Sequence, residues 1–357
     1  MEIGIVGLPN VGKSTLFNAL TGAGVAAENF PFTTIEPNVG IVPLADSRLT
    51  VLAKEWESKK VTPSGIRFVD IAGIVKGASQ GEGLGNKFLS NIRSVDAICH
   101  VVRCFHDENV VNATGDLNPI EAAETIETEF LLADLQQAEK AYERYIKVAK
   151  SGDKDAKEKI EILNLAMKGF NDGKSVRTQN LPQDIIKDFQ FLTAKPILYV
   201  ANTSEDDPCD DLLNPLKELA EKEKTKVVVL CSKLEAEILE LPQEERESYY
   251  ESAGITTPGL NALAKAGQEL LGLVCFFTAG ETETRAWLVL EGTRAVNAAG
   301  KIHTDIERGF IRAEVYKFSD LEALGNYQAV KGKNLVSLEG KDYEVKDGDV
   351  VYFRFNV

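Results

Sequence analysis

The chain has 357 residues, of which 44% are hydrophobic and 27% are charged, and its formal net charge is -15. This length suggests two or three domains with ample core, and the composition is that of a soluble globular protein. The acidic balance argues against a protein that coats DNA non-specifically, so no DNA partner is expected, although a local basic surface could still touch RNA.

Five cysteines are scattered along the chain, and none of them forms a C-x-x-C pair. A zinc site or a redox motif is therefore not expected, and thiols of this kind fit a reducing cytosol. No apolar run is long enough to cross a membrane, and the strand-like residues 2–6 leave no room for a signal peptide. The sequence therefore predicts a cytoplasmic protein without a membrane partner.

The first motif follows an apolar run directly and reads G-x-x-x-x-G-K-S over residues 7–14. Gly7 and Gly12 permit backbone angles that point successive N–H groups at phosphate oxygens. Lys13 would reach the β- and γ-phosphates, and the Ser14 hydroxyl would bind Mg²⁺. The alternative is a chance glycine turn, but an expected strand before the motif and an expected helix after it favour a phosphate-binding loop.

Short apolar runs alternate with helical segments, and the runs that predict strands are residues 2–6, 38–43, 66–70, 97–103, 196–201 and 226–230. This alternation is typical of a doubly wound α/β fold with a mostly parallel sheet. A ligand should bind at the carboxyl ends of the strands, where the polar motifs lie.

Two further motifs indicate a γ-phosphate sensor. Asp70 opens a D-x-x-G motif and would hold Mg²⁺ through water, while the Gly73 N–H would contact the γ-phosphate. Thr34 is the candidate for a second Mg²⁺ ligand from the protein. The glycine-rich residues 76–86 are either a plain flexible loop or a switch, and their place directly after Gly73 favours a switch.

Base recognition should come from residues 202–205, which read N-T-S-E at the end of an expected strand. GTP-binding proteins of this class use N-K-x-D, in which the Asp accepts hydrogen bonds from guanine. Here Thr203 replaces the Lys and Glu205 replaces the Asp, so we expect ATP to be preferred over GTP. Backbone groups around Asn202 and Thr203 could read the adenine amine, and Ser232 should close over the base.

The residue that activates water is not evident. Many relatives of this fold have Gln directly after the D-x-x-G glycine, but here that position is Ile74, so intrinsic hydrolysis should be slow. Asn10 could contribute an oxygen to a K⁺ ion, or it could make only a local turn hydrogen bond. His100 lies in an expected strand and is expected in the core. The catalytic assignment is limited to residues that would meet the γ-phosphate: Lys13, Thr34 and Gly73.

Between the fourth and fifth expected strands, apolar residues recur at alternating spacings of four and three over 131–149 and 160–170. Residues 151–153 interrupt this pattern, which predicts an antiparallel helical hairpin with a coiled-coil-like seam. Several lysines near the expected tip are either a solvated surface or part of a docking arm for a large partner.

A third region begins near Phe276 and contains short apolar runs at 287–290, 310–315 and 350–355. Asp347-Gly348-Asp349 is a turn signal before the last of these runs, and residues 295–299 could form one short helix. The pattern predicts a small mixed α+β module of roughly 80 residues.

These motifs resemble the Obg-like ATPase family, also called YchF, of the translation-factor-related P-loop NTPases. The resemblance lies in residues 7–15 (G-L-P-N-V-G-K-S-T), 29–37 (N-F-P-F-T-T-I-E-P), 70–73 (D-I-A-G), 81–86 (G-E-G-L-G-N) and 202–205 (N-T-S-E). Residues 298–311 are similar to the family's TGS domain. The resemblance implies a Ras-like P-loop NTPase domain (1–118 and 179–275), a helical coiled-coil insertion (119–178) and a β-grasp TGS domain (276–357).

The resemblance also implies Mg²⁺-dependent ATP hydrolysis with weaker GTP use, association with the ribosome or a ribosomal subunit, and a role in translation or stress regulation. The TGS domain and the hairpin would contact RNA or protein. Asn112 stands where relatives commonly have His, which puts a catalytic role for that position in doubt. The implied metal ligands are Ser14, Thr34 and Asp70, and the implied nucleotide contacts are Asn10, Val11, Gly12, Lys13, Ser14, Thr15, Asn202, Thr203, Glu205 and Ser232.

Two other functions stay open. Asn202 and Glu205 could still support guanine if their loop shifts, which would make the protein a GTP-dependent ribosome assembly or translation factor of the Obg type. Alternatively, nucleotide could only stabilise the fold of a binding module. The sensor residues argue against a purely structural nucleotide, because such a ligand needs no γ-phosphate contact.

Overall fold

The computed structural model describes residues 1–24, 38–71, 84–111, 117–205 and 209–356. Their contacts divide the described chain into two compact units. The first contains the described residues 1–23, 38–40, 67–71, 84–111, 117–205 and 209–266, and the second contains residues 24, 41–66 and 267–356. Among the described helices, none combines the length and the apolar character needed to cross a membrane.

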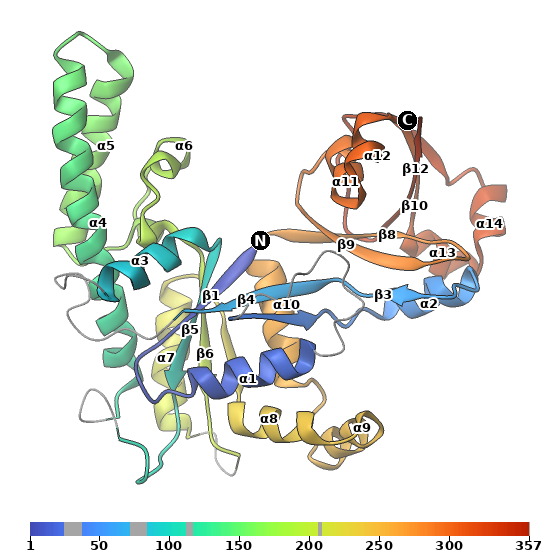
Figure 1. Cartoon of the computed structure of the whole chain (residues 1–357), viewed down its shortest axis with the longest axis horizontal. Helices are drawn as coiled ribbons and strands as arrows, with labels where there is room; N and C mark the ends of the chain where they lie inside the picture. Colours follow the sequence, from blue (N-terminus) through green and yellow to red (C-terminus); the bar gives the residue numbers. More distant parts are fainter. Residues whose placement is uncertain (25–37, 72–83, 112–116, 206–208, 357) are drawn as a thin grey trace. The chain divides into compact units, whose positions relative to one another are not determined.

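The first sheet has six strands in the order β2-β4-β1-β5-β6-β7 (Figure 1). β1 runs parallel to β4 and to β5, β5 runs parallel to β6, and β6 runs parallel to β7. This confirms the expected α/β fold with a mostly parallel sheet. The strands are β1 (Glu2–Val6), β2 (Val39–Pro43), β4 (Gly65–Asp70), β5 (Ala97–Arg103), β6 (Ile197–Asn202) and β7 (Val227–Leu230).

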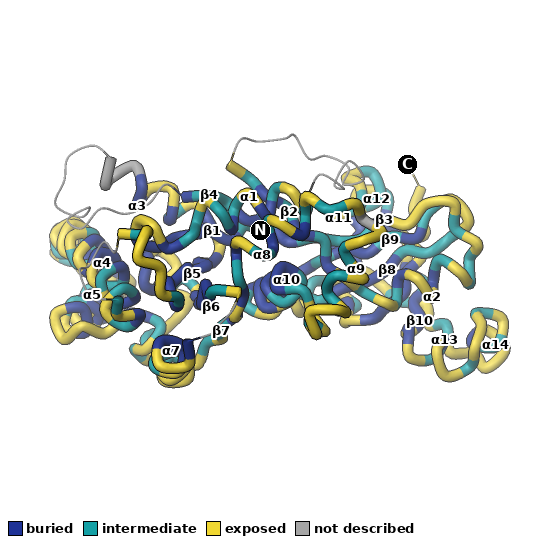
Figure 2. The backbone as a smooth tube through the Cα atoms, turned by 90° about the horizontal axis from the view of Figure 1, so that it is seen from below, coloured by how far each residue is buried: buried dark blue, intermediate teal, exposed yellow. Residues whose placement is uncertain are grey.

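The central strands of this sheet are apolar because helices cover both faces. Every residue of β5 and of β6 is buried, as Figure 2 shows by its colouring. His100 lies within β5 and is 2% exposed, which confirms its expected place in the core. The helices that follow the strands are α1 (Lys13–Gly24), α3 (Leu84–Ser94), α7 (Asp210–Lys222), α8 (Ser232–Glu240), α9 (Gln243–Ser252) and α10 (Gly259–Leu270).

The expected helical hairpin is present as α4 (Pro119–Ala149) and α5 (Lys154–Asn171). The Asn118 side chain caps α4 by accepting hydrogen bonds from two backbone N–H groups, and Pro119 occupies the first helical position. Asp153 caps α5 in the same way, through the N–H of Ala156. The two helices enclose a shared apolar core that includes Leu131, Leu163, Phe170, Phe189 and Phe191.

The buried side chain of Asp134 and the largely buried side chain of Arg177 fasten the base of this hairpin. Asp134 on α4 accepts hydrogen bonds of 2.8 Å from the backbone N–H groups of Leu192 and Thr193, and burial raises its pKa to about 6 against the effect of these bonds. Arg177 makes two hydrogen bonds of 2.8 Å to the carboxylate of Glu127. Arg177, Leu192 and Thr193 belong to the segment that follows the hairpin. Its short helices are η2 (Val176–Thr178), α6 (Gln183–Ile186), η3 (Lys187–Phe189) and η4 (Leu192–Ala194).

The second sheet also has six strands, in the order β11-β10-β12-β8-β9-β3. β10 is antiparallel to β11 and β12, and β8 is antiparallel to β9, whereas β12 runs parallel to β8 and β9 runs parallel to β3. The strands are β3 (Val61–Thr62), β8 (Leu273–Thr278), β9 (Thr284–Leu290), β10 (Phe310–Lys317), β11 (Ser337–Glu339) and β12 (Asp349–Phe355).

Each face of the second sheet carries its own apolar core. One core packs against α11 (Ala295–Ile302), and α12 (Thr304–Arg308) lies beside it. The other core includes Leu49 and Leu52 of α2 (Ser47–Glu55), together with residues of α13 (Phe318–Leu324) and α14 (Tyr327–Gly332). The expected short helix at 295–299 is present as part of α11, whereas α2, β3, β8, β11, α12, α13 and α14 were not predicted.

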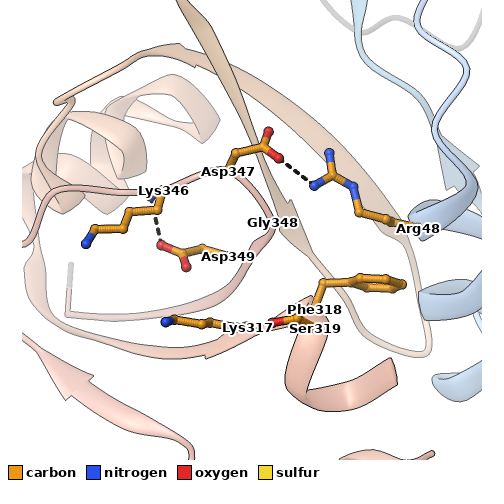
Figure 3. Close-up of a pocket in the computed structure, with 8 residues that line it drawn as sticks. All are labelled: Arg48, Lys317, Phe318, Ser319, Lys346, Asp347, Gly348 and Asp349. Carbon is orange, nitrogen blue, oxygen red and sulfur yellow. Dashed lines mark hydrogen bonds and ion pairs between the residues drawn. The ribbon is translucent and has the colours of Figure 1, made fainter. Parts of the chain in front are cut away.

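The expected turn before β12 is present at residues 347–348 and borders a cavity of about 280 Å³ (Figure 3). Asp347 accepts a hydrogen bond of 2.7 Å from Arg48, which Asp46 also contacts. Asp349 is 1% exposed and accepts a hydrogen bond from the Lys346 backbone N–H at 2.9 Å. The positive charge of Arg48 on α2 is balanced by Asp46 and Asp347, so these contacts fasten α2 to the turn before β12.

Candidate nucleotide-binding site

The G-x-x-x-x-G-K-S motif connects β1 to α1, which begins at Lys13. Gly12 has a φ of +95°, and a Cβ at this position would lie 2.2 Å from Nδ2 of Asn202. A Cβ on Gly7 would lie 2.6 Å from the carbonyl oxygen of Val101 in β5. Both glycines are therefore required by close approach of other groups, and Gly12 is required by its backbone angle as well.

Lys13 and Asp70 place opposite charges beside this loop. The Lys13 ammonium donates a hydrogen bond of 2.8 Å to the carbonyl of Leu8. Burial lowers the pKa of Lys13 and raises the pKa of Asp70. The attraction between the two opposite charges acts against both of these shifts and partly offsets them. The site thus has a cation suited to phosphate and a carboxylate suited to a hard metal ion.

Asn202 links three parts of the site through one buried side chain. Its Nδ2 donates a hydrogen bond of 2.9 Å to the carbonyl of Val11 in the phosphate loop. Its Oδ1 accepts a hydrogen bond of 2.9 Å from the backbone N–H of Ser232, the first residue of α8. The end of β6 therefore holds both the loop and the start of α8 in register.

The other residues expected at the base differ in exposure. Thr203 is 7% exposed, and its N–H donates to the carbonyl of Leu230 at 2.9 Å. Ser232 is 0% exposed, and its hydroxyl has no hydrogen-bond partner among the described residues. Glu205 is exposed. A buried unpaired hydroxyl is costly, so Ser232 Oγ is a candidate contact for a ligand.

Sequence reasoning missed Glu235, which anchors α8. Its carboxylate accepts hydrogen bonds from the N–H of Gly259 at 2.6 Å and from the hydroxyl of Tyr250 at 3.1 Å. The S-x-x-E pattern from Ser232 to Glu235 would indicate a capping box. Instead, the Cys231 sulfur caps α8, and Glu235 binds the start of α10. The local pattern therefore flags the residue but misassigns its partner.

Asn10 has a φ of +63° and is exposed. Its Nδ2 donates to the carbonyl of Val111, 101 positions away, at 3.2 Å. This contact differs from a local turn hydrogen bond, and it ties the phosphate loop to the segment after β5. The K⁺ contact of Asn10 stays a prediction.

Several expected residues lie outside the described residues: Thr34, Gly73, Ile74, Asn112 and positions 76–83 of the glycine-rich segment. The second protein ligand for Mg²⁺ and the γ-phosphate sensor therefore stay predictions. Within the part of the chain that is described, no three His, Cys, Asp or Glu side chains cluster as a metal site. A Mg²⁺ ion held by one hydroxyl, one carboxylate, phosphate oxygens and water needs no such cluster.

Comparison with known proteins agrees with this geometry. A family model described as a 50S ribosome-binding GTPase matches residues 2–149, and the YchF-GTPase C-terminal family, described as a protein of unknown function, matches residues 273–356. The chain is 51% identical to the "Ribosome-binding ATPase YchF" of Bacillus subtilis over 364 aligned positions that cover all of both proteins. It is 49% identical to the protein of that name from Escherichia coli O157:H7, covering 100% of this chain and 99% of the relative.

Solved structures give the same assignment. The YchF GTPase of Schizosaccharomyces pombe matches with a TM-score of 0.89 and 32% identity, covering 99% of this chain and 97% of that one. A GTP-binding protein from Pyrococcus horikoshii matches with a TM-score of 0.64 at 21% identity, which shows the fold alone. With a phosphate loop held by Asn202 at the end of β6, and relatives that match over the full length, the chain belongs to the YchF family of P-loop nucleotide hydrolases.

Proposed function

We propose that the chain is a cytoplasmic, ribosome-associated ATPase that depends on Mg²⁺ and acts as a slow switch in translation or stress regulation. The observation that carries the proposal is the bridge from Asn202 to the phosphate loop and to α8, because it presets a nucleotide site. The names of the bacterial relatives support ribosome binding and ATP as the substrate. Hydrolysis would be slow because Ile74 cannot orient water by hydrogen bonding.

Phosphate would be bound by the backbone of residues 10–15 and by Lys13. The hydroxyl of Ser14 and the carboxylate of Asp70 are hard oxygen donors of the kind that Mg²⁺ prefers, and Thr34 is the proposed third protein donor. Bound Mg²⁺ would neutralise charge that develops on the β- and γ-phosphates. Lys13 would give up its bond to Leu8 and bind a phosphate oxygen, while Gly73 would sense the γ-phosphate.

ATP would be preferred because the guanine-reading carboxylate is altered. Glu205 is one methylene longer than the usual Asp and is exposed, which supports a weak hold on guanine. Thr203 and Ser232 are buried where the base would bind, and the unpaired Ser232 hydroxyl supports a polar contact to the ligand. The alternative function is a GTP-dependent factor of the Obg type.

Equilibrium binding of non-hydrolysable ATP and GTP analogues with Mg²⁺, measured in K⁺ and in Na⁺ buffer, separates these functions. We expect tighter ATP binding, and Glu205→Asp should shift the preference towards GTP while the exposed exchange Glu251→Asp should not. Tighter GTP binding by the unaltered chain would replace the ATPase proposal with the GTPase alternative. Equal affinity for the ATP analogue in the two buffers would remove K⁺ from the proposal.

Hydrolysis and ribosome binding are tested on a second pair of variants. Lys13→Ala should abolish ATP hydrolysis, whereas Lys54→Ala, at an exposed site in the second unit, should not change it. Co-sedimentation with purified ribosomes and separated subunits should depend on the nucleotide. A Lys13→Ala protein that folds and binds ribosomes identically with and without ATP would favour the binding-module alternative.

We also propose the domain assignment given above, with the hairpin (119–178) and the C-terminal domain (276–357) as the parts that contact RNA or protein on the ribosome. The lysines near the hairpin tip, among them Lys147 and Lys150, support such a contact by charge.

A further inference from the structure

One face of the second sheet carries exposed side chains where β10, β11 and β12 lie next to one another. In β10, Ala313 and Val315 face the core beneath α11, so the alternate residues Arg312 and Glu314 lie on the other face. The register pairs Arg312 with Arg354, and Glu314 with both Tyr352 and Leu338. We call these five residues the open face.

The helices that pack on this side of the sheet stop short of the open face. The core formed with α2, α13 and α14 includes Tyr316 of β10 and Val350 of β12, one alternation away. Beyond them, Tyr352 is 65% exposed and Leu338 is 60% exposed. The two side chains lie on either side of Glu314, on the strands that flank β10, and both lose the burial that usually stabilises such residues.

Two arginines of the open face repel each other, which lowers the stability of the fold. Arg312 and Arg354 stand directly opposite each other on antiparallel strands, where like charges destabilise the pair. Arg354 forms an ion pair with Glu314, but Arg312 has no ion-pair partner among the described residues. The face thus carries one uncompensated positive charge in a chain whose net charge is -15. An anionic ligand would turn this repulsion into attraction.

We infer that the open face binds single-stranded RNA, with a base stacked on Tyr352 and phosphates bound by Arg312 and Arg354. Guanidinium groups bind phosphate oxygens through paired hydrogen bonds, and an exposed aromatic ring accepts any base that is free to stack. Leu338 supplies apolar surface on the other side of β10, two strands away from the ring. A duplex keeps its bases stacked inside, and an acidic peptide offers no planar group for the ring, so both fit the face less well.

This inference deepens the proposed ribosome association and rests on it for the source of the RNA. Binding of free RNA can nevertheless be measured without ribosomes or nucleotide. Failure of the RNA site would leave ATP binding and hydrolysis unchanged, whereas failure of the proposed function would appear as absent ATP binding in the unaltered chain.

The test is fluorescence anisotropy of the full chain with a labelled single-stranded oligouridine of about 12 nucleotides, a length within the range covered by single-strand-binding folds. Tyr352→Ala should weaken binding roughly tenfold, because the variant loses the ring on which a base stacks, and Tyr352→Phe should bind like the unaltered chain. Arg312→Ala should weaken binding and reduce the slope of affinity against salt by about 0.7. Leu290→Ala changes a leucine that is 50% exposed at a different place in the sheet and should have no effect.

Three outcomes would overturn the inference. The first is unchanged affinity in both Tyr352→Ala and Arg312→Ala, and the second is an equal loss in Leu290→Ala. The third is competition by duplex RNA or by an oligoglutamate peptide that matches the unlabelled oligouridine. The peptide result would assign the open face to an acidic protein partner instead. Urea unfolding of each variant confirms that changes in binding do not come from unfolding.

Discussion

The nucleotide site and the open face use polar residues in opposite ways. At the nucleotide site, Asn202 and Ser232 are 4% and 0% exposed, and the Asn202 side chain stabilises the fold by binding the Val11 carbonyl and the Ser232 backbone N–H while it shapes the site. On the open face, Tyr352 is 65% exposed and stabilises little around it. Substitutions at the nucleotide site should therefore change both the stability of the fold and ligand binding. Substitutions on the open face should change ligand binding alone.

The largest effect is expected at Gly12. Gly12→Ala should lower the free energy of unfolding by about 2–5 kcal/mol, because it combines backbone strain with a clash against Asn202. It should also abolish ATP binding. Gly152→Ala is the matched control, since Gly152 has a φ of +91° but no atom within 4 Å of its added Cβ. The control should cost only about 1–2 kcal/mol and leave ATP binding intact. Urea unfolding and nucleotide titration measure both quantities, and equal effects in the two variants would contradict the coupling.

The next effect concerns the bridge made by Asn202. Asn202→Ala leaves the Val11 carbonyl and the Ser232 N–H without their partner, which should cost about 2–3 kcal/mol and weaken ATP binding. Asn326→Ala removes a helix cap in the second unit, where Asn326 accepts from the Ala329 N–H, and should cost about 1 kcal/mol without changing ATP binding. If Asn202→Ala bound ATP with unchanged affinity, the bridge would be structural only.

A third test uses pH. Burial, with smaller contributions from the charges of Lys13 and Arg177, lowers the pKa of His100 to about 3, so His100 is neutral in the folded protein. The unfolded chain takes up this proton below its usual pKa of about 6.5, so the stability from a neutral His100 is present above that pH and is lost as the pH falls towards 3. Between pH 7 and pH 5 the loss should be about 2 kcal/mol.

His100→Gln should remove this part of the pH dependence, and His303→Gln, at an exposed ring, should keep the profile of the unaltered chain. Urea unfolding at a series of pH values measures it. A His100→Gln profile as steep as that of the unaltered chain would assign the pH dependence to other groups.

The smallest effect is expected on the open face. Tyr352→Ala should change the free energy of unfolding by no more than about 0.5 kcal/mol and leave ATP affinity unchanged, because the side chain is largely in water. A loss above about 1.5 kcal/mol would show that Tyr352 contributes to the fold, and the contrast between the two sites would fail. Urea unfolding and ATP titration of this variant provide the measurement.

The sequence indicated the phosphate loop because all of its determinants are local: an apolar run, two glycines at fixed spacing, and Lys13 and Ser14 behind them. The central strands were equally clear because β5 and β6 are mostly apolar and are buried throughout. The hairpin followed from its spacing of apolar residues.

What the sequence did not indicate depends on contacts between distant residues. Leu49 and Leu52 look like the buried side of a helix, but nothing local shows that their partners lie more than 200 positions later. The two-residue strand β3 is too short to leave a pattern. Glu235 has the spacing of a capping box, and only the fold brings Gly259 to it.

The pairing of residues 41–66 with residues 267–356 also bears on how the chain is made. These residues leave the ribosome early, and about 200 more must be added at 5–20 residues per second before their partners emerge, a delay of roughly 10–40 s. Throughout that interval Leu49, Leu52 and the strand residue Thr62 lack the surfaces that bury them. The second unit can therefore close only after residues 267–356 have been synthesised, and residues 41–66 must avoid misfolding, or stay bound to a chaperone, until then.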